Sequence, residues 1–290
     1  MYEKILVPLD GSALAEQAMP YVERLAQKLK SEVILITVCL PGEPLERALT
    51  EYIERRAEKI QSLGMKARSL CIEGEPAVSI MNFAEKNNIG LIVISTHGKA
   101  GVSHWPLGNI ASKVVQRSSI PVFLVRSSHP AKTTADKELR NILVTLDGSH
   151  FSEAIIPYVE KLAKGMGSEV TLLRVIESAK LPQLAAYRER EKYEKDFMAK
   201  MEREAERYLE RKKTAMESKG VNVKSAFLVG KPVDTILQYT EDKSANLLAL
   251  TTHGFSGIAK WAYGSVASKI IEGSPKPLLL VRPPLPVLKT

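Results

Sequence analysis

The residues with the clearest chemical potential follow two apolar runs in the first half of the chain. Asp10-Gly11-Ser12 follows the run at residues 5–9, and His97-Gly98 follows the run at residues 91–95. After nine further residues, Gly108-Asn109 stands where a helix is expected to begin. The aspartate can accept hydrogen bonds from ribose hydroxyls or amino groups, and a glycine at a helix start lets a phosphate approach free backbone N–H groups. Each feature also has an ordinary structural explanation, because Asp and Asn commonly cap helices.

The same segments recur in the second half of the chain, which is therefore a second copy of the first. Their counterparts are Asp147-Gly148-Ser149, Thr252-His253-Gly254 and, after nine residues, Gly264-Ser265. Matching residues are 137 positions apart up to Val38 and Val175, and 156 positions apart from Gly74 and Gly230 onward. The second copy therefore contains about 19 extra residues between those points.

Short apolar runs alternate with amphipathic segments in each copy. Runs that are apolar on both faces are typical of parallel strands in a sheet that helices cover on both sides. In the first copy, strands are expected at residues 5–9, 33–38, 67–72, 91–95 and 122–125, and helices at 13–30, 44–63, 76–87 and 109–118. With right-handed crossovers, this order predicts an α/β fold with two tandem, doubly wound, five-stranded parallel sheets.

The repeat also predicts the domain limits. We expect a first domain at residues 1–127, a polar linker at 128–138 and a second domain at 139–290. The extra residues lengthen the second helix of the second domain, which we expect at about residues 184–219. That helix either packs on its own domain, or extends over a binding site or towards a partner. Its apolar stripe consists of Phe197, Met201, Ala205, Tyr208 and Leu209.

Bulk composition excludes several classes of protein. The chain has 290 residues, of which 44% are hydrophobic, and its longest apolar runs are far shorter than the roughly 20 residues that cross a bilayer. Two cysteines, Cys39 and Cys71, are too few for a disulfide framework, so we expect both to be small buried hydrophobes. The net charge of +8 is spread over segments of mixed sign, which favours a solvated basic surface over nucleic-acid binding. These features, with no signal-peptide pattern, predict a soluble, cytoplasmic protein.

Ligands of open parallel sheets bind beyond the carboxyl ends of the strands, where the strand order reverses. The Asp-Gly-Ser and His-Gly segments both follow strands, so they are expected at that edge. This is the place at which the copies resemble the universal stress proteins, specifically a tandem member of the ATP-binding branch. The phosphate motif of that branch is Gly, two residues, Gly, nine residues, and Gly followed by Ser or Thr.

The two copies match this motif to different degrees. The first reads Ser95-x-x-Gly98, nine residues, Gly108-Asn109, and the second reads Thr251-x-x-Gly254, nine residues, Gly264-Ser265. Ser265 fits the motif, whereas Ser95 and Thr251 replace its leading glycine and Asn109 replaces its final Ser or Thr. The second copy is therefore the closer match and the first is retained as a second candidate site.

The resemblance implies a Rossmann-like fold with strand order 3-2-1-4-5, in which the fifth strands at residues 122–125 and 278–281 pair with each other as a pseudo-dimer within one chain. A further homodimer stays open. It also implies ATP, ADP or AMP as the ligand, with Mg²⁺ as an option. Aspartates would contact the adenosine, valine backbones the adenine, and glycines and helix starts the phosphates. The residues so implied are Pro8, Asp10, Val38, Ile94, Ser95, Gly98, Gly108, Asn109 and Ile110 in the first copy, and Asp147, Val175, Leu250, Thr251, Gly254, Gly264, Ser265 and Val266 in the second.

The sequence contains no HExxH, CxxC or Walker motif, and we identify no nucleophile with a base or metal cage. His97 and His253 are expected to pack their loops rather than to catalyse. Lys99 and Lys260 are candidates for phosphate contacts, and Trp105 and Trp261 for a lid or an interface. Three functions stay open: an adenine-nucleotide-binding stress-response or signalling protein with an unknown protein partner, an interaction scaffold of the same fold without nucleotide, and a slow ATPase or nucleotidyl transferase.

Overall fold

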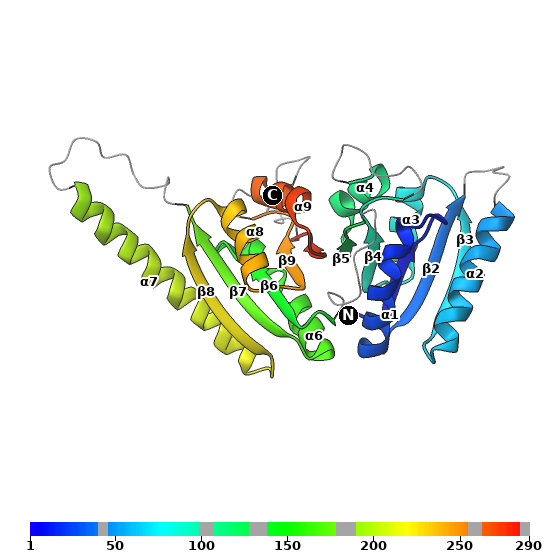
Figure 1. The fold of residues 1–290 in the computed structure, drawn as a ribbon, viewed down its shortest axis with the longest axis horizontal. Helices are drawn as coiled ribbons and strands as arrows, with labels where there is room; N and C mark the ends of the chain where they lie inside the picture. The colour runs from blue at the N-terminus through cyan, green and yellow to red at the C-terminus, as the bar shows by residue number, and fades with distance from the viewer. Residues whose placement is uncertain (40–45, 99–106, 128–137, 178–189, 255–262, 285–290) are drawn as a thin grey trace, which may run out of the picture.

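The structure is a computed structural model that describes residues 1–39, 46–98, 107–127, 138–177, 190–254 and 263–284, the side chains of 190–194 excepted. The two copies lie side by side as two α/β halves (Figure 1). The expected linker falls almost wholly outside the described residues, as do Lys99, Trp105, Lys260 and Trp261. No described helix is long and apolar enough to cross a membrane.

Each half contains five strands separated by helices, so the α/β fold class is confirmed. The first half consists of β1 (Lys4–Pro8), η1 (Ala15–Ala18), α1 (Met19–Leu29), β2 (Glu32–Cys39), α2 (Glu46–Ser62), β3 (Ala67–Glu73), α3 (Pro76–Lys86), β4 (Leu91–Ser95), α4 (Asn109–Arg117) and β5 (Val122–Val125). The second consists of β6 (Asn141–Thr145), α5 (His150–Glu153), α6 (Ile156–Met166), β7 (Glu169–Ile176), α7 (Arg190–Glu217), β8 (Asn222–Val229), α8 (Pro232–Asp242), β9 (Leu247–Thr251), α9 (Ser265–Gly273) and β10 (Leu278–Val281).

The strands described form one sheet of ten, because the two five-stranded sheets are joined by pairing of their fifth strands, as the family resemblance implied. Their order is β3-β2-β1-β4-β5-β10-β9-β6-β7-β8, which is third, second, first, fourth, fifth within each half. All pairs within a half are parallel, and β5 pairs antiparallel with β10, so that Phe123 lies opposite Leu279. A fifth strand would otherwise leave a row of unpaired backbone groups at the edge of its half, and this pairing satisfies them.

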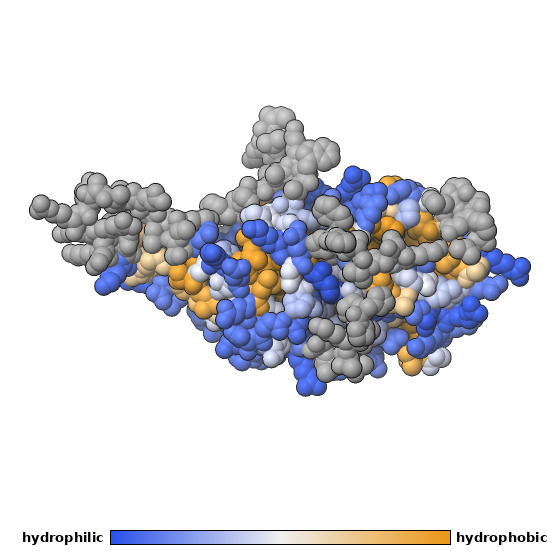
Figure 2. All heavy atoms as spheres, turned by 45° about the horizontal axis from the view of Figure 1, so that its top comes forward, coloured by the Kyte–Doolittle hydropathy of each residue, from blue (hydrophilic) through white to orange (hydrophobic). Residues whose placement is uncertain are grey.

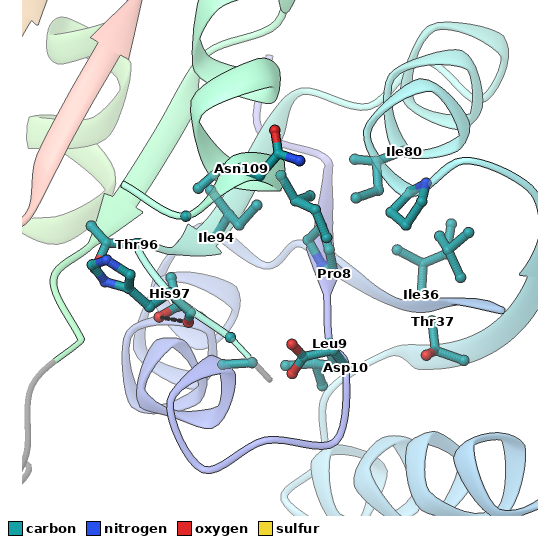
Figure 3. A pocket seen from close by; sticks show the side chains of 18 of the residues that line it. Pro8, Leu9, Asp10, Ile36, Thr37, Ile80, Ile94, Thr96, His97 and Asn109 are labelled. Atoms are coloured by element: carbon teal, nitrogen blue, oxygen red, sulfur yellow. Dashed lines mark hydrogen bonds between the residues drawn. The ribbon is translucent and has the colours of Figure 1, made fainter. Parts of the chain in front are cut away.

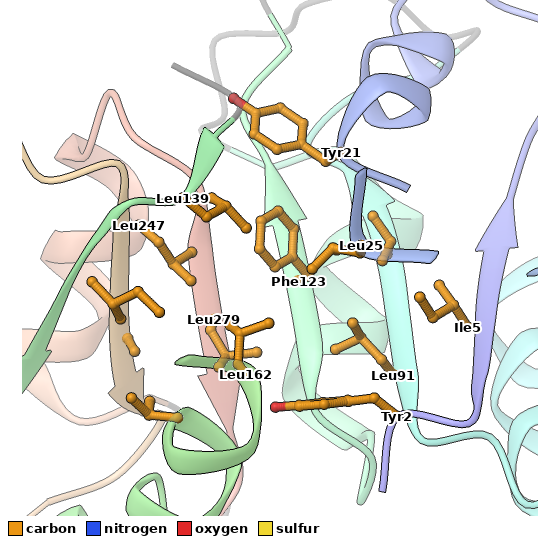
Figure 4. Close-up of a cluster of buried hydrophobic side chains, with 14 of the residues drawn as sticks. Tyr2, Ile5, Tyr21, Leu25, Leu91, Phe123, Leu139, Leu162, Leu247 and Leu279 are labelled. Carbon is orange, nitrogen blue, oxygen red and sulfur yellow. The ribbon is translucent and has the colours of Figure 1, made fainter. Parts of the chain in front are cut away.

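Helices cover both faces of the sheet. Side chains of α1, α2, α6 and α7 share one hydrophobic core with one face, and those of α3, α4, α8 and α9 share a second core with the other. Figure 4 shows the first core at the junction, where Tyr21 and Leu25 of α1 lie near Phe123 of β5, and Leu279 of β10 lies beyond it. The ring centroids of Tyr21 and Phe123 are 5.6 Å apart. The core is therefore continuous across the two halves.

The single helix expected at residues 13–30 is wrong. A 3₁₀ turn at Ala15–Ala18 precedes α1, and the second half has the equivalent break between α5 and α6. Pro20 and Pro157 stand in the first turns of α1 and α6. Proline has no N–H to donate to the preceding turn and its ring clashes there, so it starts a helix instead of continuing one.

The long helix α7 begins at Arg190, whereas the residue equivalent to the first residue of α2 is Glu202. Its extra turns are therefore at the N-terminal end. The stripe on its C-terminal part is buried against the sheet through Ala205, Tyr208 and Leu209. The helix thus packs on its own domain, and residues 178–189 lie outside the described part of the chain.

The two cysteines lie on neighbouring strands, with their Sγ atoms 3.1 Å apart and no disulfide between them. Cys39 is buried as expected, whereas Cys71 is half-exposed. The reason is that β3 is the edge strand of the sheet, and none of its residues is fully buried.

Side chains also join the halves. Arg126, directly after β5, donates hydrogen bonds to the carbonyl oxygens of Ile271, Glu272 and Ser274 at the end of α9, at 2.9, 2.7 and 3.0 Å. Because the last carbonyls of a helix have no partner within it, a guanidinium there satisfies them and opposes the negative end of the dipole. Its equivalent Arg282 makes one longer bond, 3.4 Å, to the carbonyl of Arg117.

We expect Arg126→Met to lower the free energy of unfolding by roughly 2–3 kcal/mol, because it removes several charge-assisted hydrogen bonds between the halves. Arg282→Met is the matched control and should change it by no more than about 0.5 kcal/mol. Urea unfolding followed by circular dichroism measures both. Equal effects of the two substitutions would contradict the importance of this contact.

Candidate functional site

Two cavities lie at the carboxyl ends of the strands, one in each half. The first has a volume of about 420 Å³ and the second about 440 Å³. Figure 2 shows this side of the molecule, with hydrophobic surface in separate patches over both halves and hydrophilic surface between and around them. Volumes of 300–1,000 Å³ with mixed apolar and polar walls are typical of small-molecule sites.

All seventeen residues that the family resemblance implied for ligand binding line one of these cavities. The first cavity contains all nine from the first half, and the second contains all eight from the second half. Figure 3 shows Asn109 and Asp10 at opposite ends of the first cavity, with the apolar side chains of Pro8, Ile36 and Ile80 between them. The cavities thus bring together polar groups from four separate elements.

The strand-end aspartates hold their turns together and lie against the second glycine of the motif. Asp10 Oδ1 accepts the Ser12 N–H at 3.0 Å, and the Ser12 hydroxyl accepts the Ala15 N–H at 3.1 Å. A Cβ atom on Gly98 would overlap the carboxylate of Asp10, so only glycine allows this approach. The helix-capping role belongs to Ser12, and Asp10 connects the ends of β1 and β4.

The second half repeats this arrangement. Asp147 Oδ1 accepts hydrogen bonds from the backbone N–H and the hydroxyl of Ser149, at 2.9 and 2.6 Å. Ser149 in turn caps α5 by accepting the Ser152 N–H. A Cβ atom on Gly254 would overlap the carboxylate of Asp147. The two sites therefore share the same support.

Ser95 and Thr251, which depart from the family motif, have a structural role in the loop. The Ser95 hydroxyl is 2.8 Å from the carbonyl oxygen of Leu14 and 3.0 Å from that of His97. The Thr251 hydroxyl donates to the His253 carbonyl at 2.7 Å. Both hydroxyls thus bond to the loop backbone. A glycine at the same position has no side chain and could not form this hydrogen bond.

Asn109 and Ser265 are the first helical residues of α4 and α9, and neither is an N-cap. The N-cap positions are Gly108 and Gly264, and no side chain caps either helix. The glycine N–H groups donate to Thr96 and Thr252 carbonyls at 2.7 and 2.9 Å, which closes the nine-residue loops on the strand ends. The next N–H groups at the helix start lie at the cavity wall, at the positive end of the dipole, and no side chain of the described residues caps them.

The backbone of Val38 is the third polar group of the first cavity. Pairing between β1 and β2 ends where the Leu9 N–H donates to the Ile36 carbonyl. Successive backbone groups of a strand point to alternate sides, so the N–H and C=O of Val38 point to the side where β1 has already ended. The equivalent bond from Leu146 to Leu173 leaves Val175 in the same situation.

The repeated histidines pack the loops, as expected. His97 and His253 are each 6% exposed, and their Nδ1 atoms lie 3.1 and 3.0 Å from the hydroxyls of Thr96 and Thr252. Among the residues that the structure describes, no group of three His, Cys, Asp or Glu side chains could hold a metal ion.

The residues that line the cavities and that the sequence analysis did not implicate include Thr37 and Arg174. Thr37 of β2 lines the first cavity; it is 1% exposed, and its hydroxyl has no hydrogen-bond partner. Arg174, its equivalent on β7, lines the second cavity. The sequence signal was available, because the repeat places a threonine opposite an arginine one residue before the valines Val38 and Val175.

The fold and the paired cavities define a class: tandem Rossmann-like α/β proteins with a strand-end site in each half. The universal stress protein family model matches residues 1–126 and 138–282. The chain therefore belongs to the universal stress protein family and contains two of its domains. The expected limits at residues 127 and 139 stay predictions.

Individual relatives agree with this assignment. The chain is 31% identical over 141 residues to the universal stress protein MJ0531 of Methanocaldococcus jannaschii, which covers 43% of this chain and 83% of the relative. It is 25% identical over 210 residues to the universal stress protein Rv2005c of Mycobacterium tuberculosis, covering 71% of this chain and 64% of the relative. A crystal structure of a universal stress protein from Archaeoglobus fulgidus superposes with a TM-score of 0.73 at 19% identity, over 97% of this chain and 99% of that one.

We expect Thr37→Val to raise the free energy of unfolding of the ligand-free protein by about 1 kcal/mol, because the buried hydroxyl is unpaired and valine has the same shape. Thr240→Val is the control, since the buried Thr240 hydroxyl donates to the Ile236 carbonyl at 2.7 Å. It should lower the same quantity by about 1 kcal/mol. Chemical denaturation measures both, and a loss of stability in Thr37→Val would contradict the assignment of an unpaired hydroxyl.

Proposed function

We propose that this universal stress protein binds an adenine nucleotide at the strand ends of its halves, and that occupancy changes its contacts with other proteins. The observation that carries the proposal is the uncapped start of α4 and of α9 at the wall of a cavity that also holds a carboxylate and an open strand backbone. A nucleotide requires these three kinds of group at the same time.

The chemistry of each group suits one part of the ligand. The N–H and C=O of Val38 form a donor and an acceptor side by side, which is the pattern that the amino edge of adenine complements. Asp10 offers acceptor oxygens for ribose hydroxyls, and apolar side chains such as Ile80 and Ile94 contact the base and sugar. The helix start at Gly108 supplies N–H groups and a positive dipole for phosphate.

The same assignment applies to the second half through Val175, Asp147 and Gly264. Asn109 is exposed at the start of α4, so its longer side chain does not close the first cavity. Mg²⁺, if it accompanies ATP, would be held mainly by the phosphates, because each cavity has one strand-end aspartate to add.

The test is mass spectrometry of the small molecules released when the purified, undialysed chain is denatured. We expect near-stoichiometric ATP, ADP or AMP, and a melting temperature that rises with added Mg-ATP. At a nucleotide concentration of 100 times Kd, binding adds about 2.7 kcal/mol to the free energy of unfolding.

Substitutions at the helix starts separate the sites. Ser265→Arg and Asn109→Arg each place a long side chain in one phosphate cradle, so each should remove one equivalent of nucleotide and the double variant should remove all of it. Ser218→Arg, exposed after the end of α7, is the control and should retain all of it. If the wild-type chain releases nothing and Mg-ATP leaves its melting temperature unchanged, the nucleotide-free scaffold replaces this proposal.

A further inference from the structure

Each half contains a cluster of three side chains at equivalent positions of the repeat. In the first half the Tyr52 hydroxyl of α2 donates to Glu16 at 2.8 Å, and Arg56 pairs with the same carboxylate. The equivalent cluster in the second half consists of Tyr208, Glu153 and Lys212, in which Lys212 Nζ lies 2.7 Å from Glu153. The two clusters consist of equivalent residues, but the buried Tyr208 hydroxyl has no hydrogen-bond partner among the described residues, whereas that of Tyr52 donates to Glu16.

Two charged residues that line the second cavity, Arg174 and Glu177, have no charged counterpart in the lining of the first. Thr37 in the first cavity is replaced by Arg174 in the second. Both stand on the second strand of their half, next to the valine whose backbone is open to the cavity. The position is therefore at the end of the cavity that the proposed function assigns to the adenosine, away from the phosphate cradle of α9.

The Arg174 guanidinium lies between two surfaces. It is 5.2 Å from the centroid of the Tyr208 ring, and its atoms lie 2.9–3.2 Å from where a Cβ atom of Gly148 would be. Burial and the nearby Glu153 carboxylate raise the pKa of Tyr208, so the ring stays neutral and its face attracts the cation. Because Gly148 directly follows Asp147, the guanidinium is held next to the strand-end aspartate.

Arg174 has five N–H donors and, among the described residues, forms no hydrogen bond or ion pair. Oδ1 of the neighbouring Asp147 carboxylate accepts from Ser149 rather than from Arg174. Glu177 also lines the cavity without pairing with Arg174. A guanidinium held over an aromatic ring at a cavity wall, with no acceptor among the described residues, is suited to a phosphate, which it binds through two parallel hydrogen bonds.

We propose that Arg174 makes the second cavity selective for an adenosine 5′-phosphate with a second phosphate on its ribose, whereas the first cavity, with Thr37, takes a nucleotide with free ribose hydroxyls. Two kinds of dinucleotide-binding site differ in the same way. In one an acidic residue accepts a hydrogen bond from the ribose hydroxyl, and in the other a nearby arginine accommodates a ribose phosphate. This inference rests on the proposed function. The long helix α7 contributes Tyr208, whose ring holds the guanidinium in place.

The test uses isothermal titration calorimetry on the full chain with Asn109→Arg, which leaves the second cavity open. The probes are AMP and the 2′,5′- and 3′,5′-bisphosphates of adenosine. We expect the better bisphosphate to bind roughly ten- to a hundredfold more tightly than AMP, as a charge-assisted bidentate contact allows. Adding Arg174→Thr should abolish the preference and leave AMP binding within about threefold, since the hydrogen bonds to the rest of the nucleotide are intact.

Two further variants complete the comparison. Arg203→Thr removes an equal charge from an exposed position of α7 and should keep the preference. The Ser265→Arg chain, which leaves the first cavity open, should bind AMP at least as tightly as either bisphosphate. Equal melting temperatures of the Arg174 and Arg203 variants verify that both are folded.

The outcomes separate the two proposals. If AMP binds but neither bisphosphate binds more tightly in the second cavity, the selectivity is refuted and the proposed function stands. An equal loss of AMP and bisphosphate affinity in Arg174→Thr would also refute it, because Arg174 would then contact a part that both ligands share. If no adenine nucleotide binds in either cavity, both proposals are wrong.

Discussion

The antiparallel pairing of β5 with β10 is the contact on which the rest of the architecture depends. Each half alone is a five-stranded parallel sheet with one unpaired edge at its fifth strand. Pairing these two edges satisfies their backbone groups, continues the hydrophobic core through Phe123 and Leu279, and places the end of α9 within reach of Arg126. Two separate copies could form this pairing only by associating, which costs translational and rotational entropy. The duplicated chain forms it within one molecule and avoids that cost.

The parallel order within each half has a direct consequence for function. All carboxyl ends of its strands meet at one edge, and the first strand is shorter at that edge than the second. The result is an open strand backbone, an aspartate and an uncapped helix start around one cavity, in both halves. Glycine is required where β4 and β9 approach the aspartates, because a Cβ atom there has no space. Ser95 and Thr251 replace the leading glycine of the family motif. Their hydroxyls bond to the loop backbone, so these side chains fit at the strand ends in both halves.

Duplication also lets one site change while the other is kept. The clusters around Tyr52 and Tyr208 match, yet the lengthened helix α7 contributes Met201 to the second cavity, and β7 contributes Arg174. A cation held by stacking on an aromatic ring keeps its hydrogen-bond donors for a ligand. The halves therefore have the same fold but differ in charge beside the open backbone of the second strand.

The sequence by itself determined the tandem repeat, the α/β class and most strand positions, and the resemblance to a known family pointed to seventeen of the cavity-lining residues. It could do so because strand periodicity and turn glycines are local features that occur twice. Other features depend on what lies opposite in space. Pro20 divides a predicted helix through its contact with the preceding turn, and Asn109 and Ser265 are helical residues because the glycines before them take the cap position. The unpaired hydroxyl of Thr37 and the position of the Arg174 guanidinium over the Tyr208 ring were decided by tertiary structure, since burial and hydrogen-bond satisfaction depend on residues far apart in the chain.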